Sequence, residues 1–193
     1  MQDRIKGWLA IHMQVVNHLQ KDPELLLTVE RAAQLCITTF RQNNKVLLCG
    51  NGGSAADAQH LAAEFSGRFL KDRPPLYAEA MHVNTSYLTA VSNDYGFDQI
   101  FERLLRAKGK RGDLIIGLST SGNSVNVVRA FETANQLGIH SIALTGASGG
   151  RLKSLATVWI GVPSEDVPRI QEAHILIGHL ICGLVEEELF SGL

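Results

Sequence analysis

The chain is expected to adopt an α/β fold in which one parallel sheet carries helices on both faces. Short apolar runs that suit buried strands alternate along the sequence with longer segments of helical periodicity. Two of these runs are followed by loops rich in Gly, Ser, Thr and Asn, and such loops lie where open α/β sheets bind ligands. The 193 residues contain no repeat, low-complexity tract or interdomain linker, so we expect one domain over residues 1–193.

Two helices are expected before the first strand. Apolar residues recur at helical spacing over residues 5–19, and Asp22-Pro23 then breaks the pattern. A second helix is expected over about 24–41. We interpret residues 1–41 as an extension of the α/β unit that covers a sheet edge or packs against another subunit.

Strands and helices alternate through the rest of the chain. Short apolar runs bounded by turn residues predict strands, and the clearest is 114–118. Pro168 suits the first turn of a long final helix. The expected strands are 45–49, 78–83, 114–118, 141–145 and 157–162. The expected helices are about 55–69, a segment from 85, 97–108, a segment that opens after the Ser/Thr loop and runs to 137, and 168–190.

The composition is that of an ordinary globular protein. Hydrophobic residues make up 45% of the chain and charged residues 19%, and the net charge is −1. The most basic stretch, residues 103–111, is interleaved with Leu and Gly and is better explained as a solvated helix end than as a nucleic-acid patch. We therefore expect no nucleic-acid partner.

Cysteine usage and hydropathy favour a cytoplasmic protein. Cys36, Cys49 and Cys182 are far apart and lie in apolar patterns, which indicates buried free thiols. The N-terminus lacks the apolar core of a signal peptide. No apolar run approaches the roughly 20 residues needed to span a bilayer, so no membrane association is expected.

The second polar loop is a candidate phosphate site. It presents four hydroxyls just before and at the expected start of a helix, whose free N–H groups and dipole favour an anion. These hydroxyls belong to Ser119, Thr120, Ser121 and Ser124. The alternative is that they only cap the helix and shape the turn, although one Ser would suffice for a cap.

The first polar loop carries a weaker signal. Gly50-Asn51-Gly52-Gly53-Ser54 is neither a complete dinucleotide fingerprint nor a P-loop, because the P-loop Lys is absent. Its glycines would let the backbone approach a ligand closely, with Asn51 adding polar contacts. Taken alone, the loop is little different from an ordinary tight turn.

Two pairs of side chains form a candidate metal or acid/base cluster. His60 and Glu64 are spaced i, i+4, and Gln171 and His179 are spaced i, i+8, so each pair lies on roughly one face of a helix. Imidazole, carboxylate and amide oxygen suit a divalent metal such as Zn²⁺. Separate structural or solvent-facing roles are the alternative, and His174 would be a packed residue or a neighbour of Gln171.

At these residues the sequence resembles the sugar isomerase (SIS) fold and, within it, the phosphoheptose isomerases. The STSGNS loop is typical of the superfamily, and the HxxxE and QxxxxxxxH pairs together point to the isomerase branch. The resemblance covers essentially the whole chain. The segments that carry it are CGNGGSAADAQHLAAEFSGRF (49–69), SNDYGFDQIF (92–101), LSTSGNSVNVV (118–128), ALTGASGG (143–150) and PRIQEAHILIGH (168–179).

This resemblance implies a five-stranded parallel sheet and a homotetramer with active sites between subunits, in which residues 1–41 contribute to oligomer packing. It also implies interconversion of D-sedoheptulose 7-phosphate and D-glycero-D-manno-heptose 7-phosphate, the entry to heptose synthesis for lipopolysaccharide or other surface glycans. The matching zinc ligands, one ion per subunit, are His60, Glu64, Gln171 and His179. The matching substrate contacts are Asn51, Gly52, Gly53, Glu64, Asn93, Asp94, Ser119, Thr120, Ser121, Ser124 and Gln171.

Glu64 and His179 are the expected catalytic acid/base pair of this aldose–ketose isomerisation. Which of the two takes the carbon-bound proton stays open. One departure from the family pattern is Pro168, because some members carry an acidic residue there; Glu165 and Asp166 lie slightly earlier.

Two other functions compete with the isomerase. The first is a non-catalytic SIS protein of the DiaA type, which binds the replication initiator; that branch lacks the Glu and the final His, whereas this chain has Glu64 and His179. The second is a sugar-phosphate sensor or an isomerase for another phosphosugar. Sensors usually attach the domain to a DNA-binding module, and no segment here is long enough to provide one. The sequence therefore favours the enzyme.

Overall fold

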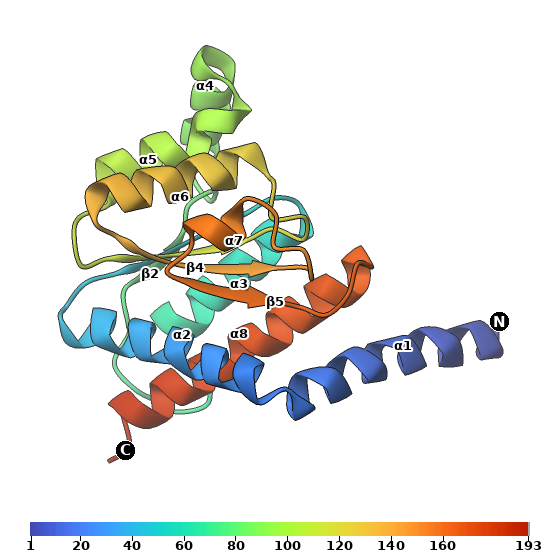
Figure 1. Cartoon of the computed structure of the whole chain (residues 1–193). Helices are drawn as coiled ribbons and strands as arrows, with labels where there is room; N and C mark the ends of the chain where they lie inside the picture. The colour runs from blue at the N-terminus through green and yellow to red at the C-terminus, as the bar shows by residue number, and fades with distance from the viewer. Residues whose placement is uncertain (193) are drawn as a thin grey trace.

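A five-stranded parallel sheet forms the centre of the molecule, which we describe from a computed structural model covering residues 1–192 (Figure 1). The strand order is β2-β1-β3-β4-β5. The strands are β1 Val46–Gly50, β2 Ala78–Ala80, β3 Leu114–Leu118, β4 His140–Thr145 and β5 Val158–Gly161. The sheet confirms the predicted α/β class and the five strands implied by the resemblance.

The chain reverses its direction of travel across the sheet between β1 and β3. After β1 it moves outward to β2, and from β3 it moves the other way to β4 and β5. Gly50 and Leu118 pair at the carboxyl ends of these neighbouring strands, so the two polar loops start side by side. Open α/β sheets bind ligands at such a switch point.

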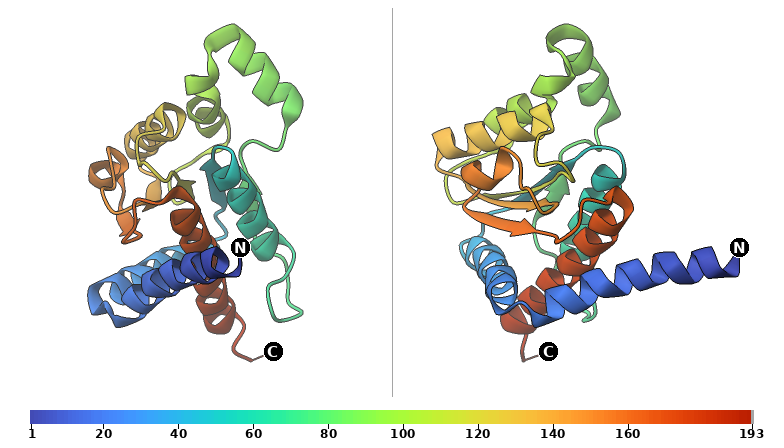
Figure 2. Two further views of the ribbon diagram at one scale, coloured as in Figure 1. Left: turned by 90° about the vertical axis from the view of Figure 1, so that its right-hand side faces the viewer. Right: turned by 45° about the vertical axis from the view of Figure 1, so that its right-hand side comes forward.

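Helices cover both faces of the sheet (Figures 1 and 2). One core cluster joins the sheet to α2, α3 and α8, and the other joins it to the helices of the opposite face. Every residue of β1 and β3 is buried, as expected for central strands packed on two sides. The helices are α1 Gln2–Lys21, α2 Pro23–Arg41, α3 Gly53–Ser66, α4 Thr85–Tyr95, α5 Ile100–Lys108, α6 Val125–Leu137, α7 Leu152–Leu155 and α8 Val167–Leu189, with a short 3-10 turn at Phe97–Gln99.

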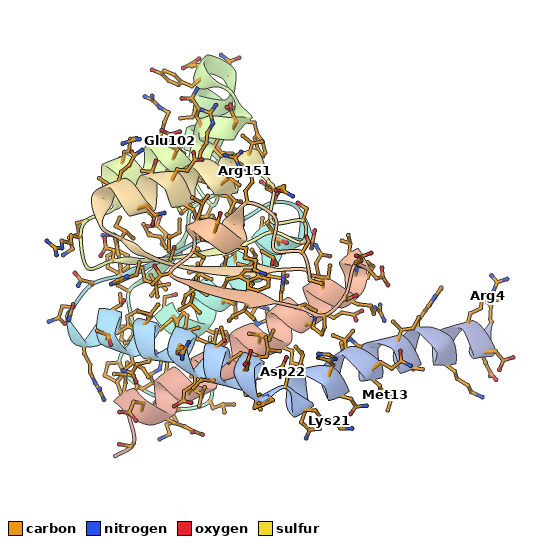
Figure 3. The ribbon with its side chains drawn as sticks, in the orientation of Figure 1. Arg4, Met13, Lys21, Asp22, Glu102 and Arg151 are labelled. Atoms are coloured by element: carbon orange, nitrogen blue, oxygen red, sulfur yellow. The ribbon has the colours of Figure 1, made fainter. Side chains whose placement is uncertain are left out.

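Helix α1 projects away from the body of the molecule, and its side chains extend into open space along most of its length (Figure 3). Trp8 is 62% exposed, and Ile5, Leu9 and Met13 are also exposed. Where α1 meets α8, Arg169 donates to the carbonyl of Trp8. In the part of the chain that the structure describes, no helix is both long enough and apolar enough to cross a membrane.

Three details of the predicted elements were wrong. The helix predicted to reach residue 69 ends at Ser66, because the chain turns at Gly67. There the Arg73 guanidinium donates hydrogen bonds to the carbonyl oxygens of Phe65 and Gly67. The strand predicted over 78–83 ends at Ala80, since the chain then turns toward the start of α4. The four-residue helix α7 was not predicted, because it is too short to show periodicity.

Other predictions are confirmed. The three cysteines are free and buried, and burial raises the pKa of the Cys36 and Cys49 thiols to about 12. Pro168 lies in the first turn of α8, where its missing N–H costs no hydrogen bond.

Candidate functional site

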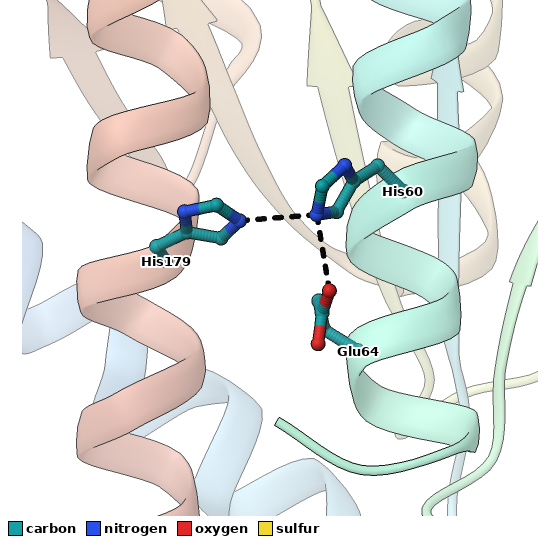
Figure 4. A group of neighbouring side chains, drawn as sticks. All are labelled: His60, Glu64 and His179. Carbon is teal, nitrogen blue, oxygen red and sulfur yellow. Dashed lines mark hydrogen bonds and ion pairs between the residues drawn. The ribbon is translucent and has the colours of Figure 1, made fainter. Parts of the chain in front are cut away.

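His60, Glu64 and His179 converge between α3 and α8 (Figure 4). The His60 Nε2 atom lies 3.0 Å from Glu64 Oε1 and 3.2 Å from His179 Nε2. One ligand atom from each of the three residues lies within 4.8 Å of the other two. The structure therefore unites two segments that are 119 positions apart in the sequence.

A glycine allows the two helices to approach at this point. Gly178 precedes His179 on α8, and a Cβ atom placed on it would lie 2.6 Å from the methyl carbons of Leu61, the neighbour of His60. A larger residue would force the Leu61 side chain to move or push α8 away from α3. The absence of a side chain at Gly178 thus favours the close approach of the two helices beside His60 and His179.

The three side chains fit a divalent metal. Two imidazole nitrogens and a carboxylate oxygen already face a common point, which is the donor set preferred by Zn²⁺. Two Nε2 atoms at 3.2 Å need a shared proton or a cation between them, because their lone pairs otherwise repel. The His60 side chain is 48% exposed, so a ligand can reach this point from solvent.

Gln171 lies on α8 two turns before His179. Its amide packs against the start of α3, where a Cβ atom on Gly53 would lie 2.6 Å from Gln171 Nε2. The glycine in the first polar loop thus makes room for a side chain of the candidate site. Close approach to a protein side chain is the observed role of Gly53.

The hydroxyls of the Ser/Thr loop differ in exposure: Ser119 is buried, Thr120 and Ser124 are half-buried, and Ser121 is exposed. Ser124 is the N-cap of α6, yet its side chain makes no capping hydrogen bond; its Oγ lies 2.9 Å from Ser119 Oγ instead. Thr120 and Ser121 line a cavity of about 230 Å³ at the carboxyl end of the sheet, and Glu165 also lines it. The N-terminal amides of α6 and these hydroxyls together favour an anion.

The first polar loop is tied to the second. The side-chain amides of Asn51 and Asn126 exchange two hydrogen bonds of 2.9 Å, and Asn126 also accepts from the Val127 amide. Gly52 has φ +57°, a left-handed conformation that favours glycine. Asn126 was not identified from the sequence, although its position just inside the predicted helix marks it as a neighbour of the loop.

Asn93 and Asp94 lie elsewhere in the chain. Both are exposed near the end of α4, and Asn93 Nδ2 donates to Asp94 Oδ1. Helix α4 packs with the cluster on the face opposite to α3 and α8 (Figures 1 and 2). Within one chain, the structure does not bring these two residues to the His/Glu cluster.

Two further residues near the cluster were missed by the sequence analysis. Asp57 lies one turn before His60 on α3, and burial raises the pKa of its carboxyl while the charge of His60 opposes this shift. Its i, i+3 spacing from His60 could have revealed it. The Phe69 ring lies 5.4 Å from the His179 ring, centroid to centroid, and nothing in the local sequence pattern indicates that contact.

Comparison with known proteins decides the family. Residues 13–146 match the SIS domain family. The phosphoheptose isomerase of Aneurinibacillus thermoaerophilus is 50% identical over 190 residues, which cover 98% of this chain and 96% of that protein. The chain belongs to the phosphoheptose isomerase family of SIS-domain proteins.

Other members of this family support the same assignment. Phosphoheptose isomerase 2 of Campylobacter jejuni is 51% identical over 187 residues, which cover 97% of this chain and 93% of that protein. The structure of the phosphoheptose isomerase GmhA from Neisseria gonorrhoeae superposes with a TM-score of 0.90 at 41% identity, covering 96% of this chain and 98% of that one. A phosphoheptose isomerase from Francisella tularensis gives a TM-score of 0.91 at 35% identity with the same coverage.

Proposed function

We propose that this protein is an aldose–ketose isomerase that converts D-sedoheptulose 7-phosphate to D-glycero-D-manno-heptose 7-phosphate. This reaction is the first step of heptose synthesis for lipopolysaccharide or other surface glycans. The observation that carries the proposal is the convergence of His60, Glu64 and His179 in a chain about half identical to phosphoheptose isomerases. The same relatives favour the enzyme over a DiaA-like binding protein.

Glu64 and His179 would move the protons. The reaction removes a proton from C1 of the ketose and returns one to C2 through an enediol, while a second group transfers protons between the two oxygens. The two side chains come from different helices and both lie next to the Nε2 atom of His60, so they could act on adjacent carbon and oxygen atoms of one sugar. A base and an acid in one small cluster are what this step requires.

The same cluster would hold one Zn²⁺ per subunit, with Gln171 as the fourth ligand beside His60, Glu64 and His179. The donor set supports this choice, because His nitrogen and carboxylate oxygen are typical zinc ligands. When bound, the ion would polarise the substrate carbonyl and stabilise the charge of the enediolate. A side chain fully committed to a metal is a poor base, so we expect Glu64 or His179 to be loosely coordinated.

The Ser/Thr loop would bind the phosphate of the sugar. The hydroxyls of Ser119, Thr120, Ser121 and Ser124 can donate from a small volume, and the start of α6 adds backbone N–H groups. Asn51, Gly52 and Gly53 would contact the sugar from the adjoining loop. The loops begin beside each other on β1 and β3, which supports a single extended site.

We further propose a cytoplasmic homotetramer with active sites between subunits. The projecting helix α1 exposes Trp8, Leu9 and Met13, which suits packing against another copy. A second copy is also the simplest way to supply Asn93 and Asp94, which lie across the sheet from the cluster of their own chain.

The proposal is tested by incubating the purified protein with sedoheptulose 7-phosphate and following the aldoheptose phosphate by NMR. The protein would be stripped with chelator and assayed with and without added Zn²⁺. We expect turnover that the chelator abolishes and Zn²⁺ restores, and no turnover of sedoheptulose without its phosphate. A folded protein that is inactive in every metal condition would contradict the proposal.

A further inference from the structure

A buried carboxylate on α8 holds the segment that follows α3. Glu186 is 2% exposed and lies two turns beyond His179 on the same helix. Its carboxylate accepts hydrogen bonds from the backbone N–H groups of Phe69, Leu70 and Lys71, at 3.2, 2.8 and 2.7 Å. Residues 67–73 form neither helix nor strand, so their position depends on contacts of this kind.

Arg73 completes this anchor. Its Nε donates to Glu186 at 2.9 Å, in an ion pair whose two side chains are almost fully buried. The rest of the guanidinium reaches the end of α3, where it donates to the carbonyl oxygens of Phe65 and Glu64 at 2.9 and 2.8 Å. Arg73 thus hydrogen bonds to carbonyl groups at the end of α3, the helix that carries His60, and joins α3 to α8 through Glu186.

The held segment places an aromatic ring against the candidate catalytic histidine. The ring centroids of Phe69 and His179 are 5.4 Å apart with an interplanar angle of 32°, and those of His179 and His60 are 5.0 Å apart. The Phe69 ring also lies over Gly183, where a Cβ atom would be 3.6 Å away. The His179 ring therefore contacts two other rings, those of Phe69 and His60.

We propose that Phe69 is a positioning residue that fixes the orientation of the His179 imidazole, and that Glu186 and Arg73 hold Phe69 in place. The inference rests on the proposed isomerase function, in which His179 is one of the acid/base pair. A histidine on a helix surface otherwise samples several rotamers, and each one would move Nε2 away from His60. Packing against a flat ring removes those alternatives without using a hydrogen bond of the imidazole.

The test compares Phe69→Ala with a matched control, Phe190→Ala. Phe190 packs on the other end of the same anchor, with its ring centroid 5.4 Å from the Arg73 guanidinium carbon. Phe69→Tyr keeps an aromatic ring and serves as the conservative variant. For each protein we would measure kcat, KM, the melting temperature and, in crystals, the distance between the Nε2 atoms of His60 and His179.

We expect kcat to fall about 10- to 100-fold in Phe69→Ala with little change in KM, because a displaced catalytic group costs rate more than binding. Phe69→Tyr and Phe190→Ala should retain most of the wild-type kcat. In crystals, His179 should leave its contact with His60 only in Phe69→Ala.

Equal losses of kcat in the two alanine variants, in step with their melting temperatures, would overturn the inference, and so would an unmoved His179 in Phe69→Ala. An inactive wild-type protein would contradict the proposed function instead. The position of His179 in the crystals would still decide the inference in that case.

Discussion

Two carboxylates on the packed helices α3 and α8 differ in how completely they are hydrogen bonded. Glu186 is buried and accepts bonds from three backbone N–H groups and from Arg73. Glu64 is partly exposed and pairs with His60, which also faces His179. A carboxylate with all its lone pairs engaged can only hold structure, whereas one with free lone pairs can bind a metal or accept a proton. Helices α3 and α8 thus carry both a structural carboxylate, Glu186, and a carboxylate of the candidate site, Glu64.

The largest expected effect is on activity, in Glu64→Gln. Losing a general acid/base group lowers kcat by about 100- to 10,000-fold. The melting temperature should change little, because this carboxylate is only partly buried. Steady-state kinetics on sedoheptulose 7-phosphate and a thermal melt would measure both. Glu187→Gln, at an exposed position of α8, is the control and should keep wild-type kcat.

Glu186→Gln should show the opposite pattern, with stability as the main loss. Breaking a buried ion pair leaves Arg73 without its charged partner and costs about 3–5 kcal/mol of unfolding free energy. Urea denaturation would measure this. Glu188→Gln, also on α8, removes an exposed ion pair with Arg41 of α2 and should cost about 0–1 kcal/mol. Equal losses of unfolding free energy in Glu186→Gln and Glu188→Gln would contradict the prediction that the buried ion pair stabilises the fold more than the exposed one.

Lowering the pH should destabilise the folded protein through the protonation of a buried histidine on α8. Burial lowers the pKa of His174 to about 4, with the Thr145 backbone opposing this shift. The folded state therefore keeps His174 neutral while the unfolded state takes up a proton below its usual pKa of about 6.5. Stability from this group is complete above pH 6.5 and is lost as the pH falls toward 4, by about 3 kcal/mol in total.

Urea denaturation at several pH values would detect this loss, and His174→Leu should flatten the curve between pH 6.5 and 4.

Glu186 adds a second acid-sensitive contribution. Burial acts to raise the pKa of its carboxyl, but hydrogen bonds from Lys71, Leu70, Arg73 and Phe69 lower it overall. Its stabilising effect is present above the ordinary pKa of about 4.3 and is lost at lower pH, below the range of His174. If the unfolding free energy of His174→Leu fell between pH 6.5 and 4 as steeply as that of the wild type, the role given to His174 would be contradicted.

The smallest expected effect is at the phosphate loop. Ser124→Ala removes one of several donors, and a single hydrogen bond contributes about 0.5–1.5 kcal/mol, so KM should rise up to about tenfold with kcat nearly unchanged. Ser154→Ala, at an exposed position of α7, is the control. A fall in kcat with unchanged KM would place Ser124 in the chemical step rather than in phosphate binding.

The sequence predicted the central strands best, because β1 and β3 are apolar runs in which every residue is buried. It could not predict where α3 ends, since the apolar spacing of Phe65 and Phe69 continues the helical pattern past Ser66. The end is decided by Arg73, which lies in the loop after α3, and by Glu186, which holds Arg73 and is 113 positions away from it. Side-chain periodicity carries no information about such long-range hydrogen bonds.

The candidate site was predicted in residue type and only partly in geometry. Spacing placed His60 with Glu64 on one helix, but the approach of His179 depends on Gly178 packing against Leu61, a contact between separate helices. Asn93 and Asp94 were predicted from resemblance, and their position on α4 depends on packing that local sequence does not encode. Sequence spacing therefore predicts which side chains lie on one face of a helix more directly than it predicts which helices bring their side chains together.

The most direct test of the central claim is to convert sedoheptulose 7-phosphate with the wild-type protein and with Glu64→Gln in D₂O, following the products by NMR. An enediol route that passes protons through Glu64 and His179 predicts aldoheptose 7-phosphate carrying deuterium at C2, formed rapidly by the wild type and hardly at all by Glu64→Gln. No product from the folded wild-type protein with Zn²⁺, or equal rates from the two proteins, would contradict it.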